Sequence, residues 1–174
     1  TFYPSDSFVQ VVNQSGSYNT TYYYAGNILL AADNGSIAYY HPDHLGSTTL
    51  VTDSSGALLR ETRYGPFGAV LSGGNDRYLY TGQEFDAETD LYYYGARFYK
   101  PSYYHFTQPD PLIEVYDPQS LNRYAYVQNN PYKYTDPTGE FIDVVADIGF
   151  IAYDIYSIIK DPTEKSNYAS LGLD

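Results

Sequence analysis

Short apolar runs separated by turn signals recur about every ten residues through the first part of this chain. The first runs are residues 8–12, 20–24, 28–32 and 37–40. Asn34 and Gly35 separate the last two runs, and Asn-Gly is a dipeptide typical of tight hairpin turns. Strands this short, each followed by a turn, predict an antiparallel meander.

The same rhythm continues to residue 99. It predicts further strands at residues 48–52, 57–64, 78–80, 91–94 and 97–99. Residues 101–137 are rich in Pro, Asn and Asp, which predicts irregular structure, with 123–127 as a short helix or a strand. The predicted fold class is therefore mainly β, a strip of antiparallel hairpins followed by an irregular segment.

Tyrosine accounts for 24 of the 174 residues, and the chain has no tryptophan, methionine or cysteine. The tyrosine ring favours half-buried pleated surfaces while its hydroxyl reaches water or a partner, which fits β structure better than a helical bundle. The absence of cysteine excludes disulfides, thiol catalysis and cysteine-based zinc sites.

The formal net charge is −12, from 21 acidic residues against 9 basic ones. Nucleic acids and anionic membrane surfaces are bound by clustered Lys and Arg. This charge balance therefore disfavours both as partners.

Residues 141–160 change from the strand period to the helical period and predict one C-terminal α-helix, which Asp161-Pro162 ends. Asp143, Asp147 and Asp154 lie opposite its apolar face, and three acids argue against a membrane span. The apolar residues expected to mediate assembly are Phe141, Val144, Val145, Ile148, Ile151 and Ile155. Their partner is expected to be the tyrosine-rich sheet of the same chain or of a neighbouring copy.

Several motifs occur in an order that resembles the Rhs repeat-associated core of Rhs, YD-repeat and toxin-complex C proteins. They are YYHPDHLGST at 39–48, YGPFG at 64–68, YTGQEFD at 80–86, LYYYGARFY at 91–99, LNRYAY at 121–126, NNP at 129–131 and DPTG at 136–139. The resemblance implies a strip of β-hairpins that, in larger members, spirals into a hollow shell around a toxin. It also implies secretion or exposure at the cell surface. It divides the chain into a core β-domain, 1–140, and the start of a variable region, 141–174.

His41, Asp43 and His44 have two interpretations, a metal site or structural hydrogen bonding. Further His or Glu at ligand spacing is missing nearby, and in the resembling family the motif occurs in scaffolds. We therefore expect hydrogen bonding, with no metal and no cofactor.

Asp110 and Asp136 are the candidate catalytic residues. In cleaving members of the resembling family, two Asp-Pro-x-Gly motifs supply an aspartate pair that cuts just beyond the second motif, here between Glu140 and Phe141. The second motif is intact, but Ile113 stands where the first needs glycine. We therefore expect two turn-forming Asp-Pro corners, no autoproteolysis and no enzyme.

The first function hypothesis is an extracellular structural protein that self-assembles into a fibre or surface polymer through β edges and the C-terminal helix. The alternative is the closing segment of a toxin-encapsulating shell, with or without the aspartyl cut. In that case the partners are a parent shell and a C-terminal toxin. The first residues lack the basic start and apolar run of a signal peptide, so we interpret the sequence as a piece of a longer precursor or a mature fragment.

Overall fold

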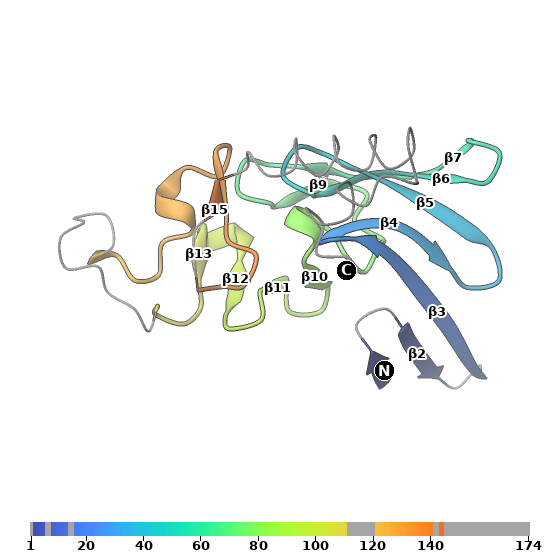
Figure 1. The fold of residues 1–174 in the computed structure, drawn as a ribbon. Helices are drawn as coiled ribbons and strands as arrows, with labels where there is room; N and C mark the ends of the chain where they lie inside the picture. Colours follow the sequence, from blue (N-terminus) through green and yellow to red (C-terminus); the bar gives the residue numbers. More distant parts are fainter. Residues whose placement is uncertain (1, 6–7, 14–15, 111–120, 141–142, 145–174) are drawn as a thin grey trace, which may run out of the picture.

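The computed structural model describes residues 2–5, 8–13, 16–110, 121–140 and 143–144, and a seven-stranded antiparallel sheet dominates them. Its strands follow one another in chain order, as the meander prediction requires (Figure 1). They are β1 (Phe2–Ser5), β2 (Phe8–Asn13), β3 (Gly16–Ala25), β4 (Ile28–Asp33), β5 (Ile37–Pro42), β6 (Thr48–Asp53) and β7 (Leu58–Glu61).

The turn between β6 and β7 shows how the sequence makes these hairpins. The Asp53 carboxylate accepts the backbone N–H groups of Ser55 at 2.8 Å and Ala57 at 2.9 Å. Gly56 follows with φ of 84°, in the left-handed region that glycine enters without steric cost. The side chain of the aspartate thus closes the turn, and the glycine reverses the chain.

A second antiparallel sheet has four strands, β10 (Glu84–Asp86), β11 (Leu91–Tyr93), β12 (Phe98–Lys100) and β13 (His105–Phe106). Two short pairs join β8 (Arg63–Tyr64) with β9 (Val70–Ser72) and β14 (Tyr134–Thr135) with β15 (Asp143–Val144). Three 3₁₀ turns connect these elements, η1 (Tyr80–Gly82), η2 (Pro101–Tyr103) and η4 (Val127–Asn129).

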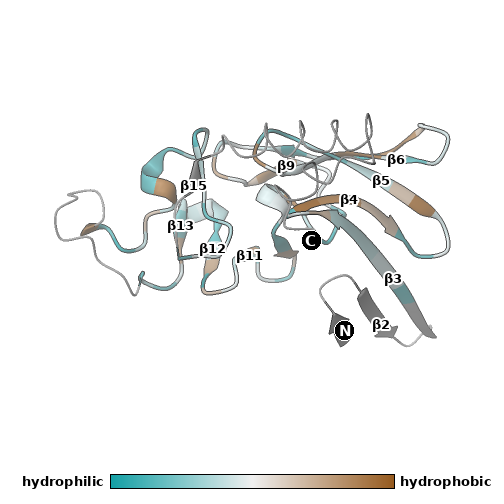
Figure 2. Cartoon of the chain, viewed as in Figure 1, coloured by the Kyte–Doolittle hydropathy of each residue, from teal (hydrophilic) through white to brown (hydrophobic). Residues whose placement is uncertain are grey.

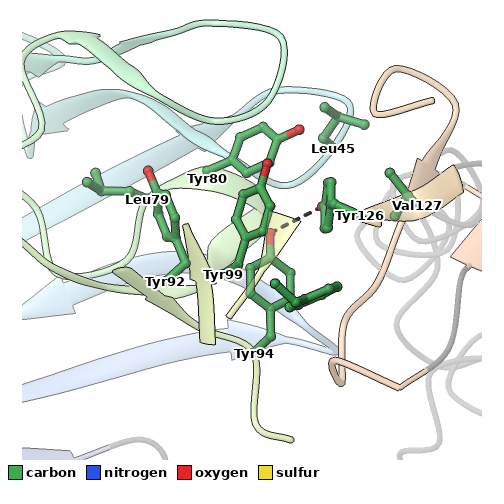
Figure 3. Packing of buried hydrophobic residues seen from close by; sticks show 9 residues of the cluster. Leu45, Leu79, Tyr80, Tyr92, Tyr94, Tyr99, Tyr126 and Val127 are labelled. Atoms are coloured by element: carbon green, nitrogen blue, oxygen red, sulfur yellow. Dashed lines mark hydrogen bonds between the residues drawn. The ribbon is translucent and has the colours of Figure 1, made fainter. Parts of the chain in front are cut away.

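The main core is formed by β11, β12 and β13 with the turns η1 and η4, and it is built largely from tyrosine (Figure 3). Tyr80, Tyr92, Tyr94, Tyr99 and Tyr126 are all buried. Their rings pack at 4.5 to 6.4 Å between centroids, in tilted and edge-on arrangements that suit aromatic quadrupoles. Their hydroxyls find acceptors: Tyr92 donates to the carbonyl of Gly68 at 2.9 Å and Tyr99 to that of Phe67 at 2.8 Å. Satisfied hydroxyls are what allow tyrosine to serve as a core residue.

Two predicted strands are wrong in part. Residues 78–80 form only an isolated bridge from Tyr78 to Glu84 before η1, because Thr81 at φ 50° turns the chain and Tyr80 enters the core. The predicted strand at 57–64 is two strands, since β7 pairs with β6 whereas β8 pairs with β9.

The segment 123–127 makes one bridge, from Ala125 to His105, and then enters η4, so it is neither a regular strand nor an α-helix. At the C-terminal end, Asp143 and Val144 pair with Thr135 and Tyr134 as strand β15. The helix predicted over 141–160 is therefore wrong at Asp143 and Val144, and its other residues lie outside the described ones. Within the described chain, no helix is both long and apolar enough to cross a membrane.

Candidate functional site

Arg97, directly before β12, is a charged residue inside the aromatic core. Only 5% of its side chain is exposed. Its guanidinium carbon lies 3.8 Å from the centre of the Phe106 ring, a favourable cation–π distance. A buried charge is costly unless it is paired, so the position of this arginine requires acidic partners.

Those partners are the two aspartates that the sequence singled out. Arg97 Nη1 lies 3.0 Å from Asp110 Oδ2, and Nη2 lies 3.2 Å from Asp136 Oδ2. Its Nε donates to the carbonyl oxygen of Gly139 at 2.5 Å. We call Arg97, Asp110, Asp136 and Gly139 the Arg97 clamp. The structure thus joins the two Asp-Pro motifs at one guanidinium, where sequence reasoning expected two separate corners.

Asp136 is the most enclosed acid of the clamp, with 2% of its side chain exposed. Its Oδ1 accepts the backbone N–H groups of Gly139 at 2.7 Å and Glu140 at 3.1 Å. This is the turn chemistry that Asp53 uses in the β6–β7 hairpin. Asp136 does form the expected turn, and its second oxygen is left to bind Arg97.

Position 139 requires glycine for two reasons, its left-handed backbone conformation and the close approach of the Tyr94 backbone. Its φ is 77°, and a Cβ at this position would lie 2.8 Å from the carbonyl oxygen of Tyr94. The neighbouring backbone is held too, since the N–H of Ala96 donates to the Thr138 carbonyl at 3.0 Å. The Gln83 side chain donates to the Pro137 carbonyl at 3.0 Å. The DPTG motif is therefore fixed against the loop between β11 and β12.

Asp110 is held by the segment that carries the LNRYAY motif. Its N–H donates to the carbonyl of Arg123 at 2.7 Å, and Arg123 Nε donates back to the Asp110 carbonyl at 2.7 Å. Its side chain is 22% exposed, so the clamp opens to solvent on this side. Ile113, the departure from the first motif, lies outside the described residues.

The chemistry available to the clamp follows from where the carboxylates point. Both face the guanidinium, which favours a charge-assisted structural contact. Asp136 also binds the amide of Glu140, the residue before the expected cut. The geometry therefore supports a structural clamp directly, and it bonds one carboxylate to the Gly139–Glu140 peptide, one residue before the bond that a cleaving member would hydrolyse.

In the cluster of His41, Asp43 and His44, the side chains of His41 and Asp43 make hydrogen bonds within β5, β6 and the loop between them. His41 Nε2 lies 2.9 Å from Thr52 Oγ1, while Asp43 Oδ1 accepts the N–H groups of Leu45 and Ser47 at 2.9 Å each. In the part of the chain that the structure describes, no three residues among His, Asp and Glu gather closely enough to hold a metal ion. The geometry of Asp43 is that of a turn residue.

Buried hydroxyls form a second polar feature beside the clamp. Tyr94 donates to the Tyr126 hydroxyl at 3.2 Å (Figure 3). The Tyr94 oxygen also lies 2.7 Å from Thr81 Oγ1. Burial, which disfavours the charged phenolate, raises the pKa of both tyrosines well above the ordinary value. These hydroxyls therefore stay protonated and act as structural hydrogen-bonding groups.

Among the predicted assembly residues, only Val144 falls within the described chain, where it pairs with Tyr134. Phe141, Val145, Ile148, Ile151 and Ile155 lie outside it. Sequence reasoning missed Arg97. The available signal was a lone arginine in an otherwise apolar and aromatic motif, a setting in which a cation needs buried acids as partners.

Comparison with known proteins gives a family match. The sequence model of a family described as teneurin YD-shell matches residues 6–132. The chain is 35% identical to the tRNA3(Ser)-specific nuclease WapA of Bacillus spizizenii, over 89% of this chain and 7% of that protein. It is also 35% identical to toxin subunit YenC1 of Yersinia entomophaga, over 61% of this chain and 11% of that protein.

The fold also resembles part of larger solved structures. A crystal structure of TcdB2-TccC3-TEV superposes with a TM-score of 0.66 at 27% identity, covering 80% of this chain and 7% of that one. The chain spans only about a tenth or less of the length of these relatives. The mainly antiparallel β architecture is thus shared with one small part of much larger proteins.

Proposed function

Because the chain belongs to the teneurin YD-shell family and is an Rhs/YD-repeat domain, we propose that it is the closing segment of an Rhs shell. Its role there is structural and non-enzymatic. It ends the β-strip and fixes the point at which the chain leaves the shell domain. The partners that this role implies are the parent shell and a toxin region C-terminal to Gly139.

The Arg97 clamp carries this proposal. One buried guanidinium binds both Asp-Pro motifs and the carbonyl of Gly139, the last residue of the second motif. The clamp therefore holds the chain in place at Gly139, which we take as the point where the downstream chain begins. A segment whose task is to present a downstream region needs such a fixed exit point.

The relatives support association with a toxin. Two of them are named as a tRNA nuclease and a toxin subunit, and a third, 34% identical over 70% of this chain, is toxin protein Tse5 of Pseudomonas aeruginosa. This chain covers 7 to 11% of their lengths. We propose that it serves such an assembly from a secreted or surface-exposed protein, and that the nuclease activity in the first name belongs to other parts of that relative.

Replacement of Arg97 tests the clamp. We expect Arg97→Met to lower the free energy of unfolding by about 3–5 kcal/mol, because two aspartates lose their buried counter-charge. The matched control is Arg63→Met, which breaks an exposed pair with Glu61 and should change stability by about 0–1 kcal/mol. Urea denaturation followed by circular dichroism measures both. Equal effects of the two variants would mean that the Arg97 clamp does not stabilise the fold.

Autoproteolysis is a second candidate function, and one observation favours it: Asp110 and Asp136 meet at one guanidinium beside the Glu140 amide. The departure at Ile113 opposes it. We expect the purified 19.7 kDa chain to keep its full mass during long incubation. A fragment that begins at Phe141, and that disappears in Asp136→Asn, would establish the cut instead.

Self-assembly into a fibre is the rival structural role, since a β-strip has edges that can pair with another copy. Electron microscopy of the purified chain separates the two roles. The closing-segment proposal expects discrete particles across a range of concentrations. Filaments would favour the fibre.

A further inference from the structure

One face of the seven-stranded sheet carries a row of paired residues that crosses five strands and holds three exposed apolar side chains. The pairing register aligns Tyr23 with Ala31, Ala31 with Tyr39, Tyr39 with Thr52, and Thr52 with Leu58. Directly paired residues project to the same face, so these five side chains form one line from β3 to β7. We call this line the outer stripe.

The three large apolar side chains of the outer stripe are open to solvent within the described chain. Tyr23 is 49% exposed, Tyr39 42% and Leu58 59%, whereas the small Ala31 between the two tyrosines is buried at 8%. The opposite face of the same strands holds Tyr22, Tyr40 and Val51, which are buried in the core of this sheet. Figure 2 shows the apolar stretches that β4, β5 and β6 contribute to the sheet. The sheet therefore has two apolar faces, and the core covers only one of them.

The rows on either side of the outer stripe are more polar. Thr21, Asp33 and Ile37 lie across the strands on one side, and His41, Leu50 and Glu61 on the other. An apolar line with charged groups at its margins is typical of an interface, which has an apolar centre and a polar rim exposed to solvent. Its width suits one helix better than a second sheet.

The sequence of the same chain predicts a helix of matching form. Residues 145–160 place Ile148, Ile151 and Ile155 on one helical face, and Asp147 and Asp154 away from it. Five strands at about 4.8 Å spacing make the stripe about 19 Å long. Sixteen helical residues at about 1.5 Å each span about 24 Å, enough to cover it.

The attachment of this segment favours the same chain over a second copy. Strand β15 pairs Asp143 and Val144 with β14, so residue 145 starts from a fixed point on the folded domain. Covalent attachment to the same domain gives a segment an effective concentration of about a millimolar, above that of a separate molecule. We propose that the outer stripe is the docking site for residues 145–160 of the same chain. This proposal is independent of the shell role.

Engineered cysteine pairs test the docking, because the native chain has no cysteine. The first partner is Tyr39→Cys, at the centre of the stripe. The second is Ile148→Cys or Ile155→Cys on the apolar helical face, and the matched control is Ser157→Cys on the opposite face. All pairs are made in the full chain and oxidised under the same mild conditions.

We expect at least one of the two apolar-face pairs to give a disulfide within the monomer, at least about tenfold more than the Ser157 control. Non-reducing electrophoresis and peptide mass mapping identify the product. A disulfide-linked dimer as the main product would assign the stripe to a second copy and overturn the proposal. Equal yields from all pairs, or no disulfide from either apolar-face pair, would also overturn it. Tyr39 is exposed, so its replacement leaves the core intact, and circular dichroism verifies this.

Discussion

At the residue scale, Gly68 shows how packing and backbone conformation combine. Its φ is 83°, nearly that of Gly56 at 84°, but their surroundings differ. A Cβ on Gly68 would lie 2.3 Å from the ring of buried Tyr80, whereas one on Gly56 would meet nothing within 4 Å. The two glycines therefore separate the cost of a left-handed backbone from the cost of overpacking.

We predict that Gly56→Ala lowers the free energy of unfolding by about 1–2 kcal/mol, the cost of a side chain in the left-handed region. Gly68→Ala should lose about 1–3 kcal/mol more, because the Tyr80 ring must move. Urea denaturation of both variants gives the difference. Equal losses would mean that Tyr80 does not pack against Gly68.

The Arg97 clamp could be predicted from the sequence only in part. Asp110 and Asp136 could be selected from the sequence because the segments that they begin resemble the two Asp-Pro-x-Gly motifs of the cleaving family members. Their meeting at Arg97 could not, since it depends on how the segments holding residues 97, 110 and 136 fold together. Local pattern predicts turns well, whereas a buried ion pair is a product of tertiary packing.

At the element scale, the β5–β6 connection is stabilised by protein hydrogen bonds. Asp43 Oδ1 accepts two backbone N–H groups, and His41 contacts Thr52. We predict that EDTA leaves the melting temperature unchanged within about 1 °C, since the turn is complete without a metal. Differential scanning fluorimetry with and without the chelator measures it. A fall of several degrees would show that a cation supports this fold.

The hairpins were predictable and the irregular connections were not. Strands β2 to β6 follow from apolar runs bounded by Asn, Asp and Gly, because those residues close turns through local contacts. The strand predicted at 78–80 failed because burial of Tyr80 overrides the strand preference of three β-favouring residues. Strands β10, β13 and β14 were missed, since two or three residues are too short to show a period.

At the scale of the whole molecule, a tyrosine core makes stability depend on alkaline pH. Burial, followed by the negative charge of Asp76, raises the pKa of Tyr40 from 10.0 to about 12. Burial also raises the pKa values of Tyr22, Tyr64 and Tyr92 above the ordinary value. A raised pKa means that the folded chain holds protons that the unfolded chain releases.

Stability from these groups is therefore complete below pH 10 and is lost as the pH rises through their raised pKa values, which for Tyr40 means between about 10 and 12. We predict two populations among the 24 tyrosines in an absorbance titration at 295 nm. Exposed ones ionise near pH 10, and buried ones ionise only as far-UV circular dichroism reports unfolding. A single ionisation curve centred near pH 10 with the fold intact would contradict the tyrosine core.

Hydrogen exchange tests the Arg97 clamp, and with it the fixed exit point, most directly. The amides of Gly139 and Glu140 donate to Asp136, and that of Ala96 donates to the Thr138 carbonyl. We predict that NMR finds all three protected in the native chain and exchanging together at least about tenfold faster in Arg97→Met. The amide of Gly56, bonded to Asp53 far from the clamp, should keep its rate. Unchanged exchange of Gly139, Glu140 and Ala96 in the variant would contradict the account.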